Sequence, residues 1–358
     1  MSNLRLGIIG TGGIAKGCHL PALVKNPEIE VVAACDIIEE KVKTVAQLFN
    51  IKDTYTNYKD LLDRDDIDAV DICTPNYLHS VIAVDALKKG KHVITEKPDA
   101  VSVEEVLKMQ KAAEDSGKIL MAIRNNRFRS DTQFLKKYIG DGNLGEIYAA
   151  KCGWIRRRGI PGKGGWFTTK AQSGGGPLID LGVHMIDVTI WMMGNPKPVS
   201  VVGSTFSKFS SNTAQSDSVH ANFGEKKDDG IFDVEDMAMG FIKFDNGACL
   251  SIEFSWASNI EAEDAYFELM GTKAGARKHW SDPNLKIFGE ANGSVMDSSP
   301  ILSNSSYLGN GHGSNLDHFA NCILHGEEPI FKPQQGVNMI KILAAIYKSA
   351  ETGKEVIL

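Results

Sequence analysis

The first third of the sequence alternates between short apolar runs and longer segments with helical spacing. The apolar runs are rich in β-branched residues and span residues 4–10, 29–36, 69–74, 91–96 and 118–123. Runs without polar alternation predict strands that are buried on both faces, as in a parallel sheet covered by helices. The intervening segments, such as 39–49 and 80–90, have the apolar spacing of helices. We therefore predict a doubly wound α/β domain over residues 1–123.

The pattern changes after residue 123. Residues 145–157 alternate apolar and polar side chains, which predicts a strand with one face on the core. Residues 239–256 read as a hairpin with Asn246-Gly247 as its turn, a signal of type I′. Residues 124–358 are therefore expected to form an α+β domain with a large, mostly antiparallel open sheet, covered on one face by helices.

Two polar stretches interrupt this second domain. They cover residues 207–235 and roughly 289–315, and both are rich in Ser, Asn, Asp and Gly. Such composition predicts surface loops. The chain ends in an amphipathic segment, residues 336–354, whose apolar spacing predicts a helix.

Composition narrows the classes of partner. The 358 residues exceed what one hydrophobic core usually supports, and 42% hydrophobic with 23% charged residues is typical of a globular protein. A net charge of −6 offers no basic field for nucleic acid or anionic membrane. The chain starts directly with a strand pattern, has no long apolar window, and carries six scattered cysteines without a C-x-x-C pair. We expect a cytoplasmic protein with reduced thiols.

Ionisable side chains interrupt one strongly apolar segment. Residues 174–194 read as a helix entered through glycines, and Asp180, His184 and Asp187 follow the i, i+4, i+7 spacing of one helix face. These groups could satisfy one another in a core, since buried polar groups are normally hydrogen-bonded. A metal is not expected, because Asp180 and His184 supply two ligands and no zinc-like Cys/His arrangement lies nearby. A further interpretation is a catalytic carboxylate beside an imidazole, and the rest of the sequence must decide between it and the core.

A glycine-rich turn follows the first predicted strand. In GIIGTGGIA, residues 7–15, the residues Gly10, Gly12 and Ala15 fit the G-x-G-x-x-G/A spacing of a dinucleotide-binding turn. Gly10 allows the tight turn, Gly12 admits the pyrophosphate, and Ala15 keeps the helix close to the sheet. Thr11, Gly13 and Ile14 complete this predicted cofactor segment. Free N–H groups at the helix start favour the anion.

The end of the second predicted strand bears on the choice of cofactor. Asp36 stands where an acid accepts hydrogen bonds from the adenosine ribose. Its charge would repel a 2′-phosphate, and the next residue, Ile37, cannot pair with one. NAD is therefore favoured over NADP.

Three motifs together resemble one family, the glucose-fructose oxidoreductase and inositol dehydrogenase family, written Gfo/Idh/MocA. They are residues 7–15, residues 73–98 (CTPNYLHSVIAVDALKKGKHVITEKP) and residues 174–188 (GGGPLIDLGVHMIDV). The resemblance covers nearly the whole chain. It implies an NAD(P)-binding Rossmann domain, a C-terminal domain for substrate binding and oligomerisation, and an oxidoreductase acting on CH–OH groups.

The resemblance also assigns residues. It implies that Thr74, Pro75, Asn76 and His79 line the nicotinamide-ribose side of the cofactor site, that Glu96 and Lys97 lie at the reacting centre with a cis Lys97-Pro98 bond, and that Asn126 lies nearby. The sequence departs from the family at Ile37, where many members have an arginine over the adenine. Adenine binding is then weaker or made differently.

The residue chemistry fits alcohol oxidation, which removes a hydride from carbon and a proton from oxygen. His184 is the candidate base, because an unperturbed histidine pKa of about 6.5 suits proton transfer near neutral pH. Lys97 would stabilise the developing alkoxide, and the family pattern implies that Asp180 orients the ring or holds the substrate. Asp187 is expected to pack or to support these groups.

Two further features leave alternatives open. Trp166, in a glycine-rich loop, either stacks on a sugar ring or the cofactor or packs in the fold. The run Arg156, Arg157, Arg158 alternates along a predicted strand, so one or two of them face the site or all form a solvated edge.

Three hypotheses of function follow. The leading one is an NAD-dependent dehydrogenase of a secondary hydroxyl of a sugar, sugar derivative or cyclitol. The second is a glycoside-cleaving enzyme that oxidises transiently, eliminates the aglycone and restores NAD. The third, a nucleotide-sensing regulator without chemistry, would have no reason to retain Lys97, Asp180 and His184 together. The resemblance also implies a homodimer or homotetramer formed through the C-terminal sheet.

Overall fold

The chain divides into two compact units in a computed structural model that describes residues 3–210, 224, 226–302 and 311–358. The first unit is Met1–Phe128 with Tyr307–Ile340, and the second is Arg129–Ser306 with Lys341–Leu358. The sequence predicts one domain boundary, after residue 123. The units instead divide at residue 128, and a later segment returns to the first unit.

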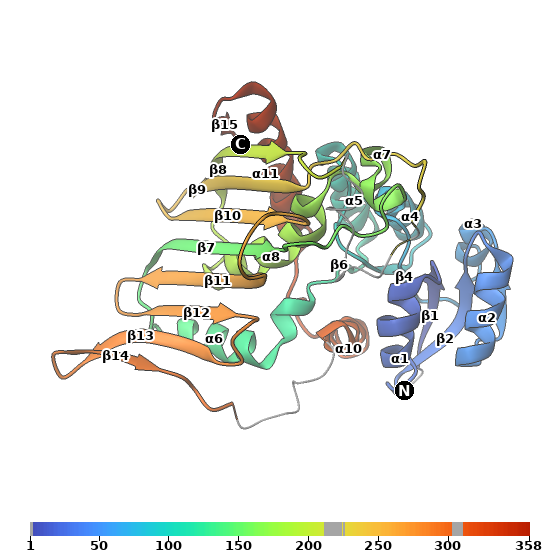
Figure 1. The fold of residues 1–358 in the computed structure, drawn as a ribbon. Coiled ribbons are helices and arrows are strands. Elements are labelled where there is room, and N and C mark those ends of the chain that lie inside the picture. The colour runs from blue at the N-terminus through green and yellow to red at the C-terminus, as the bar shows by residue number, and fades with distance from the viewer. Residues whose placement is uncertain (1–2, 211–223, 225, 303–310) are drawn as a thin grey trace. The chain divides into compact units, whose positions relative to one another are not determined.

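The first unit is built on a six-stranded parallel sheet with the order β3-β2-β1-β4-β5-β6 (Figure 1). Its strands are β1 Leu4–Ile9, β2 Ile29–Cys35, β3 Asp53–Tyr55, β4 Ala69–Ile72, β5 His92–Thr95 and β6 Leu120–Ala122. Its helices are η1 Ala15–His19 (a π turn), α1 Leu20–Leu23, α2 Glu39–Phe49, α3 Tyr58–Leu62, η2 Asn76–Leu78, α4 His79–Lys88, α5 Val103–Ser116, η3 Asn125–Phe128 and α10 Gly311–Leu324. The predicted doubly wound parallel sheet is confirmed.

Helix α10 belongs to the first unit because of its apolar face. Leu316 and Phe319 are buried in the same hydrophobic cluster as Leu6 of β1 and Met121 of β6. Burying these side chains away from water stabilises the attachment. The C-terminal part of the chain therefore contributes to both units.

The second unit contains a nine-stranded sheet with the order β14-β13-β12-β11-β7-β10-β9-β8-β15 (Figure 1). Its strands are β7 Ile147–Ile155, β8 Pro198–Phe206, β9 Met237–Phe244, β10 Cys249–Ser255, β11 Asp264–Gly271, β12 Gly275–His279, β13 Leu285–Ala291, β14 Ser294–Ser298 and β15 Val356–Ile357. Its helices are α6 Ser130–Gly140, η4 Trp166–Thr168, α7 Lys170–Ser173, η5 Leu178–Gly182 (a π turn) and α8 Val183–Met192, and α11 Pro333–Thr352 runs into it from the first unit.

The predicted mostly antiparallel sheet is confirmed, with β7 and β10 as a parallel pair. Along β10, Leu250, Ile252 and Phe254 are buried on alternate positions. Helix α8 packs on β7 and β11, and η5 packs on β10. The core of this unit therefore lies between the sheet and the segment that carries Asp180 and His184.

The one turn type predicted from the sequence differs from the structure. In the β9–β10 hairpin, Gly247 has φ +83° but Asn246 is not left-handed, and the Gly247 amide donates to the Phe244 carbonyl at 3.0 Å. The predicted type I′ turn is wrong here, because the loop is a type I turn followed by a left-handed glycine. The type I′ conformation occurs at Asn292-Gly293, with φ +52° and +73°, inside the β13–β14 hairpin.

The polar stretches are only partly loops. Residues 289–302 include the end of β13 and all of β14, and residues 311–315 begin α10. The expectation of a surface loop over 289–315 is wrong for these parts, and its residues 303–310 lie outside the described residues. Of the other stretch, 207–235, residues 211–223 and 225 also lie outside them.

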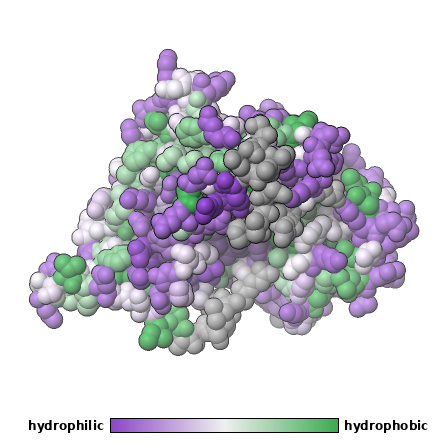
Figure 2. All heavy atoms as spheres, in the orientation of Figure 1, coloured by the Kyte–Doolittle hydropathy of each residue, from purple (hydrophilic) through white to green (hydrophobic). Residues whose placement is uncertain are grey.

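Most of the predicted elements are confirmed, including α2 at residues 39–49 and the C-terminal helix α11. The helix predicted over residues 174–194 begins as the π turn η5 and continues as α8. In the described part of the chain, no helix combines the length and hydrophobicity needed to cross a membrane. The face of the molecule in Figure 2 is mostly hydrophilic, with scattered hydrophobic patches.

Candidate active site

The carboxyl ends of the central strands meet at one edge of the parallel sheet. The Gly10 amide donates to the Cys35 carbonyl at 2.8 Å, and the Cys73 amide donates to the Ile9 carbonyl at 2.7 Å. The strand order reverses between β1 and β4, and ligands of open α/β sheets bind at such a switch point. The residues that the sequence assigns to the cofactor in this unit follow β1, β2, β4, β5 and β6 at this edge.

The glycine turn after β1 has the backbone that the motif requires. Gly10 has φ +93°, and a Cβ placed there would lie 2.6 Å from the Cys73 carbonyl oxygen. At Gly12 and Gly13 a Cβ would meet no atom within 4 Å, so the turn has an open side. Ala15 is buried in the cluster between the helix and the sheet. These features fit a bound pyrophosphate.

Asp36 is tied to the same turn. Its Oδ2 accepts hydrogen bonds from the Thr11 amide at 2.9 Å and the Thr11 hydroxyl at 3.0 Å, and its Oδ1 accepts from the Ile38 amide at 3.0 Å. Each carboxylate oxygen has two lone pairs, so Asp36 retains one acceptor site, on Oδ1, for a ribose hydroxyl. Asp36 thus positions the glycine turn as well as standing in the expected ribose location.

The segment after β4 contains a buried hydroxyl that fits a ligand. Thr74 Oγ1 is buried and has no hydrogen-bond partner among the described residues, while Asn76 is buried at the start of η2, directly after Pro75. Buried polar atoms are normally hydrogen-bonded, so an orphaned hydroxyl at this edge fits a cofactor that completes it.

His79 lies between the loop that follows β4 and the loop that follows β5. Its ring is fully buried, with Nδ1 2.7 Å from the Pro98 carbonyl oxygen and Nε2 2.8 Å from the Thr74 carbonyl oxygen. Burial lowers the pKa of His79. The ring therefore supports the backbone of the two loops next to the site.

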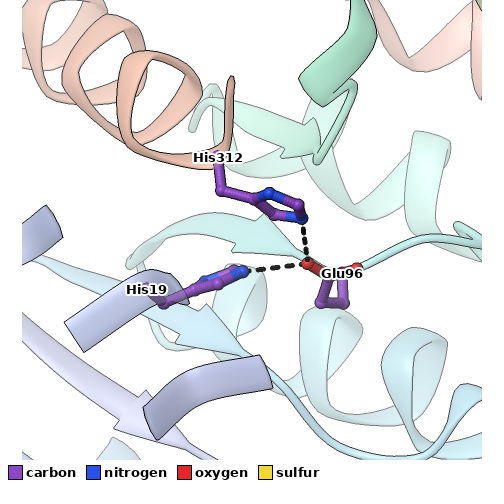
Figure 3. Close-up of side chains that lie close together, drawn as sticks. All are labelled: His19, Glu96 and His312. Atoms are coloured by element: carbon purple, nitrogen blue, oxygen red, sulfur yellow. Dashed lines mark hydrogen bonds and ion pairs between the residues drawn. The ribbon is translucent and has the colours of Figure 1, made fainter. Parts of the chain in front are cut away.

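Glu96 and Lys97 follow β5, and the Lys97-Pro98 bond is cis, as the resemblance implied. The Lys97 amide donates to Glu96 Oε2 at 3.1 Å. Glu96 Oε1 lies 2.9 Å from His19 Nε2 and 3.6 Å from His312 Nε2 (Figure 3). Burial alone would raise the pKa of Glu96, but the hydrogen bond and charge of His19, with His312 and Lys97, lower it overall.

The last predicted residue of this edge, Asn126, is buried in η3 just after β6. The Ile123 amide donates to the Thr95 carbonyl at 2.8 Å, which aligns the ends of β5 and β6. Asn126 and Lys97 thus follow neighbouring strands.

In the second unit, the glycines before Asp180 are required by close packing. A Cβ at Gly175 would lie 1.9 Å from the Tyr347 hydroxyl oxygen, and one at Gly176 would lie 2.0 Å from the Glu235 carbonyl oxygen. The Glu235 carboxylate accepts from the Gly176 amide at 3.0 Å, the Leu178 amide at 3.1 Å and the Tyr347 hydroxyl at 2.9 Å. Glu235 therefore fixes the start of the π turn that carries Asp180.

Aromatic side chains surround Asp180 and His184. Trp256 is fully buried, and its Nε1 donates to Asp180 Oδ2 at 3.0 Å. The rings of His184 and Trp154 lie 6.0 Å apart, and the Arg156 guanidinium lies 5.1 Å from the centre of the Trp154 ring. His184 is half-buried, whereas Asp187 is buried, as expected for a packing residue.

Arg156 differs from its two neighbours. Strand β7 ends at Ile155, so the three arginines do not alternate along a strand as predicted. Burial lowers the pKa of the Arg156 guanidinium, although the negative charges of Asp180 and Glu263 act to raise it. The Arg157 side chain is exposed, and Arg158 donates to the Ser258 carbonyl at 3.0 Å. The charges of Arg156 and Asp180 thus interact.

The sequence did not reveal several of these residues. Trp154, Trp256 and Glu235 carry no motif, and their roles depend on strands that pair far apart in the sequence. Trp166 was singled out, and the structure stacks its ring on Phe167 with centroids 3.8 Å apart.

The first unit has a parallel sheet with a glycine turn at its switch point, and the second unit holds a carboxylate and an imidazole among tryptophans. This combination is typical of dinucleotide-dependent oxidoreductases. The chain belongs to the Gfo/Idh/MocA oxidoreductase family: the family's NAD-binding Rossmann fold matches residues 4–123 and its C-terminal alpha/beta domain matches residues 136–358. It is therefore an NAD-binding oxidoreductase.

Named relatives include sugar dehydrogenases. The D-glucoside 3-dehydrogenase of Escherichia coli (strain K12) is 33% identical over 99% of this chain and 97% of its own length. The putative UDP-kanosamine synthase oxidoreductase subunit of Amycolatopsis mediterranei is 32% identical over 75% of this chain and 73% of its own. Levoglucosan dehydrogenase in complex with NADH and levoglucosan has the same fold, with a TM-score of 0.86 at 24% identity over 99% of each chain.

Proposed function

We propose that this protein is an NAD-dependent dehydrogenase that oxidises a secondary hydroxyl of a sugar, with the C3 hydroxyl of a D-glucoside as the first candidate. The observation that carries the proposal is the group of Asp180, His184 and Arg156 around Trp154 and Trp256. Aromatic faces and polar groups together suit a pyranose ring. The name of the relative that aligns over nearly both full lengths supports the carbon assignment.

The residues of the first unit would hold the cofactor. The turn Gly10–Ala15 would hold the pyrophosphate, Asp36 the ribose, and the segment 74–79 with Asn126 the nicotinamide side. NAD is proposed over NADP because the Asp36 carboxylate would repel a 2′-phosphate and Ile37 has no charge to offset it. When bound, NAD accepts the hydride.

Proton transfer is assigned to three residues. His184 would take the hydroxyl proton, and Asp180, held by Trp256, would orient the substrate or the imidazole. The Lys97 ammonium would stabilise the developing alkoxide.

The test is NADH absorbance with NAD and a panel of methyl glucosides, free sugars and inositols. We expect turnover of a glucoside by the wild type and loss of turnover in Lys97→Ala, which should still bind NADH in a fluorescence titration. Release of free sugar without net NADH would contradict the dehydrogenase and identify a redox-assisted glycosidase. Wild-type turnover by Lys97→Ala would contradict its assigned role.

We also propose a homodimer or homotetramer that acts in the cytoplasm. Val202 and Phe206 of β8 and Met239 and Phe241 of β9 are exposed on paired strands of the second sheet. An apolar sheet face of this kind marks an interaction surface. All six cysteines are free, which suits a reducing compartment.

A further inference from the structure

Five potential metal ligands lie together in the first unit, brought from positions far apart in the sequence. His19 lies in η1, Asp71 in β4 and Cys73 just after it, Glu96 follows β5, and His312 lies in the first turn of α10. Two overlapping groups have all their ligand atoms within 4.8 Å of one another: His19, Glu96 and His312, and His19, Asp71 and Cys73.

We propose that His19 Nε2, Glu96 Oε1 and His312 Nε2 form a binding site for one divalent transition-metal ion, with Zn²⁺ as the best match (Figure 3). Two imidazoles and one carboxylate are a donor set of three-ligand zinc sites that keep a fourth position open. This proposal departs from the expectation of no metal, and it does not depend on the proposed dehydrogenase.

The distances suit a single ion. Glu96 Oε1 lies 2.9 Å from His19 Nε2 and 3.6 Å from His312 Nε2. Donors at zinc bond lengths of about 2.0–2.1 Å in a tetrahedron are about 3.3 Å apart. Figure 3 shows both rings directed at the same carboxylate oxygen, so small side-chain movements would place all three donors on one ion.

The carboxylate that contacts His19 Nδ1 supports the assignment of His19 Nε2 as the metal ligand. Asp71 Oδ2 lies 2.8 Å from His19 Nδ1, and both side chains are fully buried. A carboxylate on the far nitrogen of a metal-bound histidine fixes the tautomer that presents the lone pair to the ion. Without an ion, the same ring must be an imidazolium between two buried carboxylates, which is the rival account.

Accessibility favours this group over the one with Cys73. Asp71, Cys73 and His19 are all buried, whereas the His312 side chain is 15% exposed and gives the ion a route from solvent. A bound ion would join η1, the end of β5 and α10. It would also hold Glu96, whose Oε2 accepts the Lys97 amide, so the ion positions the segment that carries Lys97.

The test uses the full-length, tag-free protein, stripped with a chelator and titrated with CoCl₂ or ZnCl₂. We expect about one ion per chain by elemental analysis, visible ligand-field bands of tetrahedral cobalt, and a higher midpoint of thermal unfolding with zinc. His312→Gln should weaken cobalt binding at least tenfold and abolish the zinc-dependent shift. The matched control is His325→Gln, since His325 is exposed just beyond the same helix and pairs with Glu28.

NADH binding by His312→Gln would show that this variant is folded, and Glu96→Gln, which removes the carboxylate ligand, provides a second variant with the same expected loss. A wild-type chain that binds no ion, or equal cobalt binding by the wild type and His312→Gln, would overturn the proposal. The cluster would then be an imidazolium held between Asp71 and Glu96.

Discussion

At the scale of single residues, the candidate site depends on close approaches that leave little freedom. Gly10 combines a positive φ with a carbonyl oxygen 2.6 Å from the position of its absent Cβ. Asp180 is buried and receives the indole N–H of Trp256. Each contact can be tested by a substitution that changes one atom group.

Gly10→Ala should destabilise the protein and weaken NAD binding, because the new methyl group meets the Cys73 carbonyl and the left-handed backbone disfavours any side chain. Gly90→Ala is the matched control, since Gly90 has φ +75° but open space around it. We expect about 1–2 kcal/mol of destabilisation for Gly90→Ala, the cost of φ alone, and clearly more for Gly10→Ala. Urea unfolding measures both, and equal losses would contradict the steric argument.

Trp256→Phe should leave Asp180 without its indole donor while keeping most of the buried ring. Removing the partner of a buried acceptor costs about 1–3 kcal/mol, and we expect kcat to fall on the order of tenfold. Trp280→Phe is the control, since the Trp280 ring packs on Phe267 and Arg129 instead. Unchanged kcat in Trp256→Phe would show that Asp180 does not need this hydrogen bond.

At the scale of elements, contacts with other parts of the second unit determine the conformation of residues 174–192. Its glycines admit Tyr347 and Glu235, and the Glu235 carboxylate accepts the Gly176 and Leu178 amides. The helix therefore begins with a π turn at the residues that precede His184, and π turns are frequent at functional sites.

Glu235 should make stability depend on pH. Burial raises the pKa of Glu235 above its usual value of 4.5, so folding favours the protonated form. The stabilising contribution of Glu235 to folding is therefore present below about pH 4.5 and is lost as the pH rises through the raised pKa of this group in the folded protein. The stability of the wild type relative to Glu235→Gln should fall over that range in urea unfolding from pH 4 to 7. A difference that is constant or rises with pH would contradict this assignment.

The hydrophobic pattern was sufficient to predict the long helices and strands, but it did not predict the short ones. The 11 residues of α2 and the strands β1 and β2 stand out by their apolar spacing. Strand β3 has only the residues Asp53–Tyr55 and depends on pairing with β2, so no local pattern indicates it. The Asn-Gly signal occurs at the turns of two hairpins, and only the strand register separates the type I′ turn at Asn292 from the turn at Asn246.

At the scale of the whole molecule, the sequence could not predict which residues far apart along the chain come together. The motifs located the glycine turn and Lys97, because these residues lie in local patterns. His19, Glu96 and His312 meet only because β5 enters the sheet and α10 returns to the first unit. Trp154 and Trp256 likewise depend on the pairing of β7 with β10.

The proposed oligomer can be tested through the exposed sheet face. Light scattering should give a wild-type mass that is a multiple of 39.0 kDa, and Phe241→Lys should shift it to the monomer, because Phe241 pairs with exposed Val202. Leu48→Lys, at an exposed position on α2 of the first unit, should leave the mass unchanged. A monomeric wild type would contradict the interface.

The most direct test of the central claim is transfer of label from a glucoside deuterated at C3 to NAD, followed by mass spectrometry of the dinucleotide. The account predicts deuterated NADH and a 3-keto glucoside from the wild type, and neither product from Lys97→Ala or His184→Ala under conditions where both variants still bind NADH. Reduced dinucleotide without deuterium would show oxidation at another carbon, and the absence of reduced dinucleotide with every sugar and polyol tried would contradict the dehydrogenase itself.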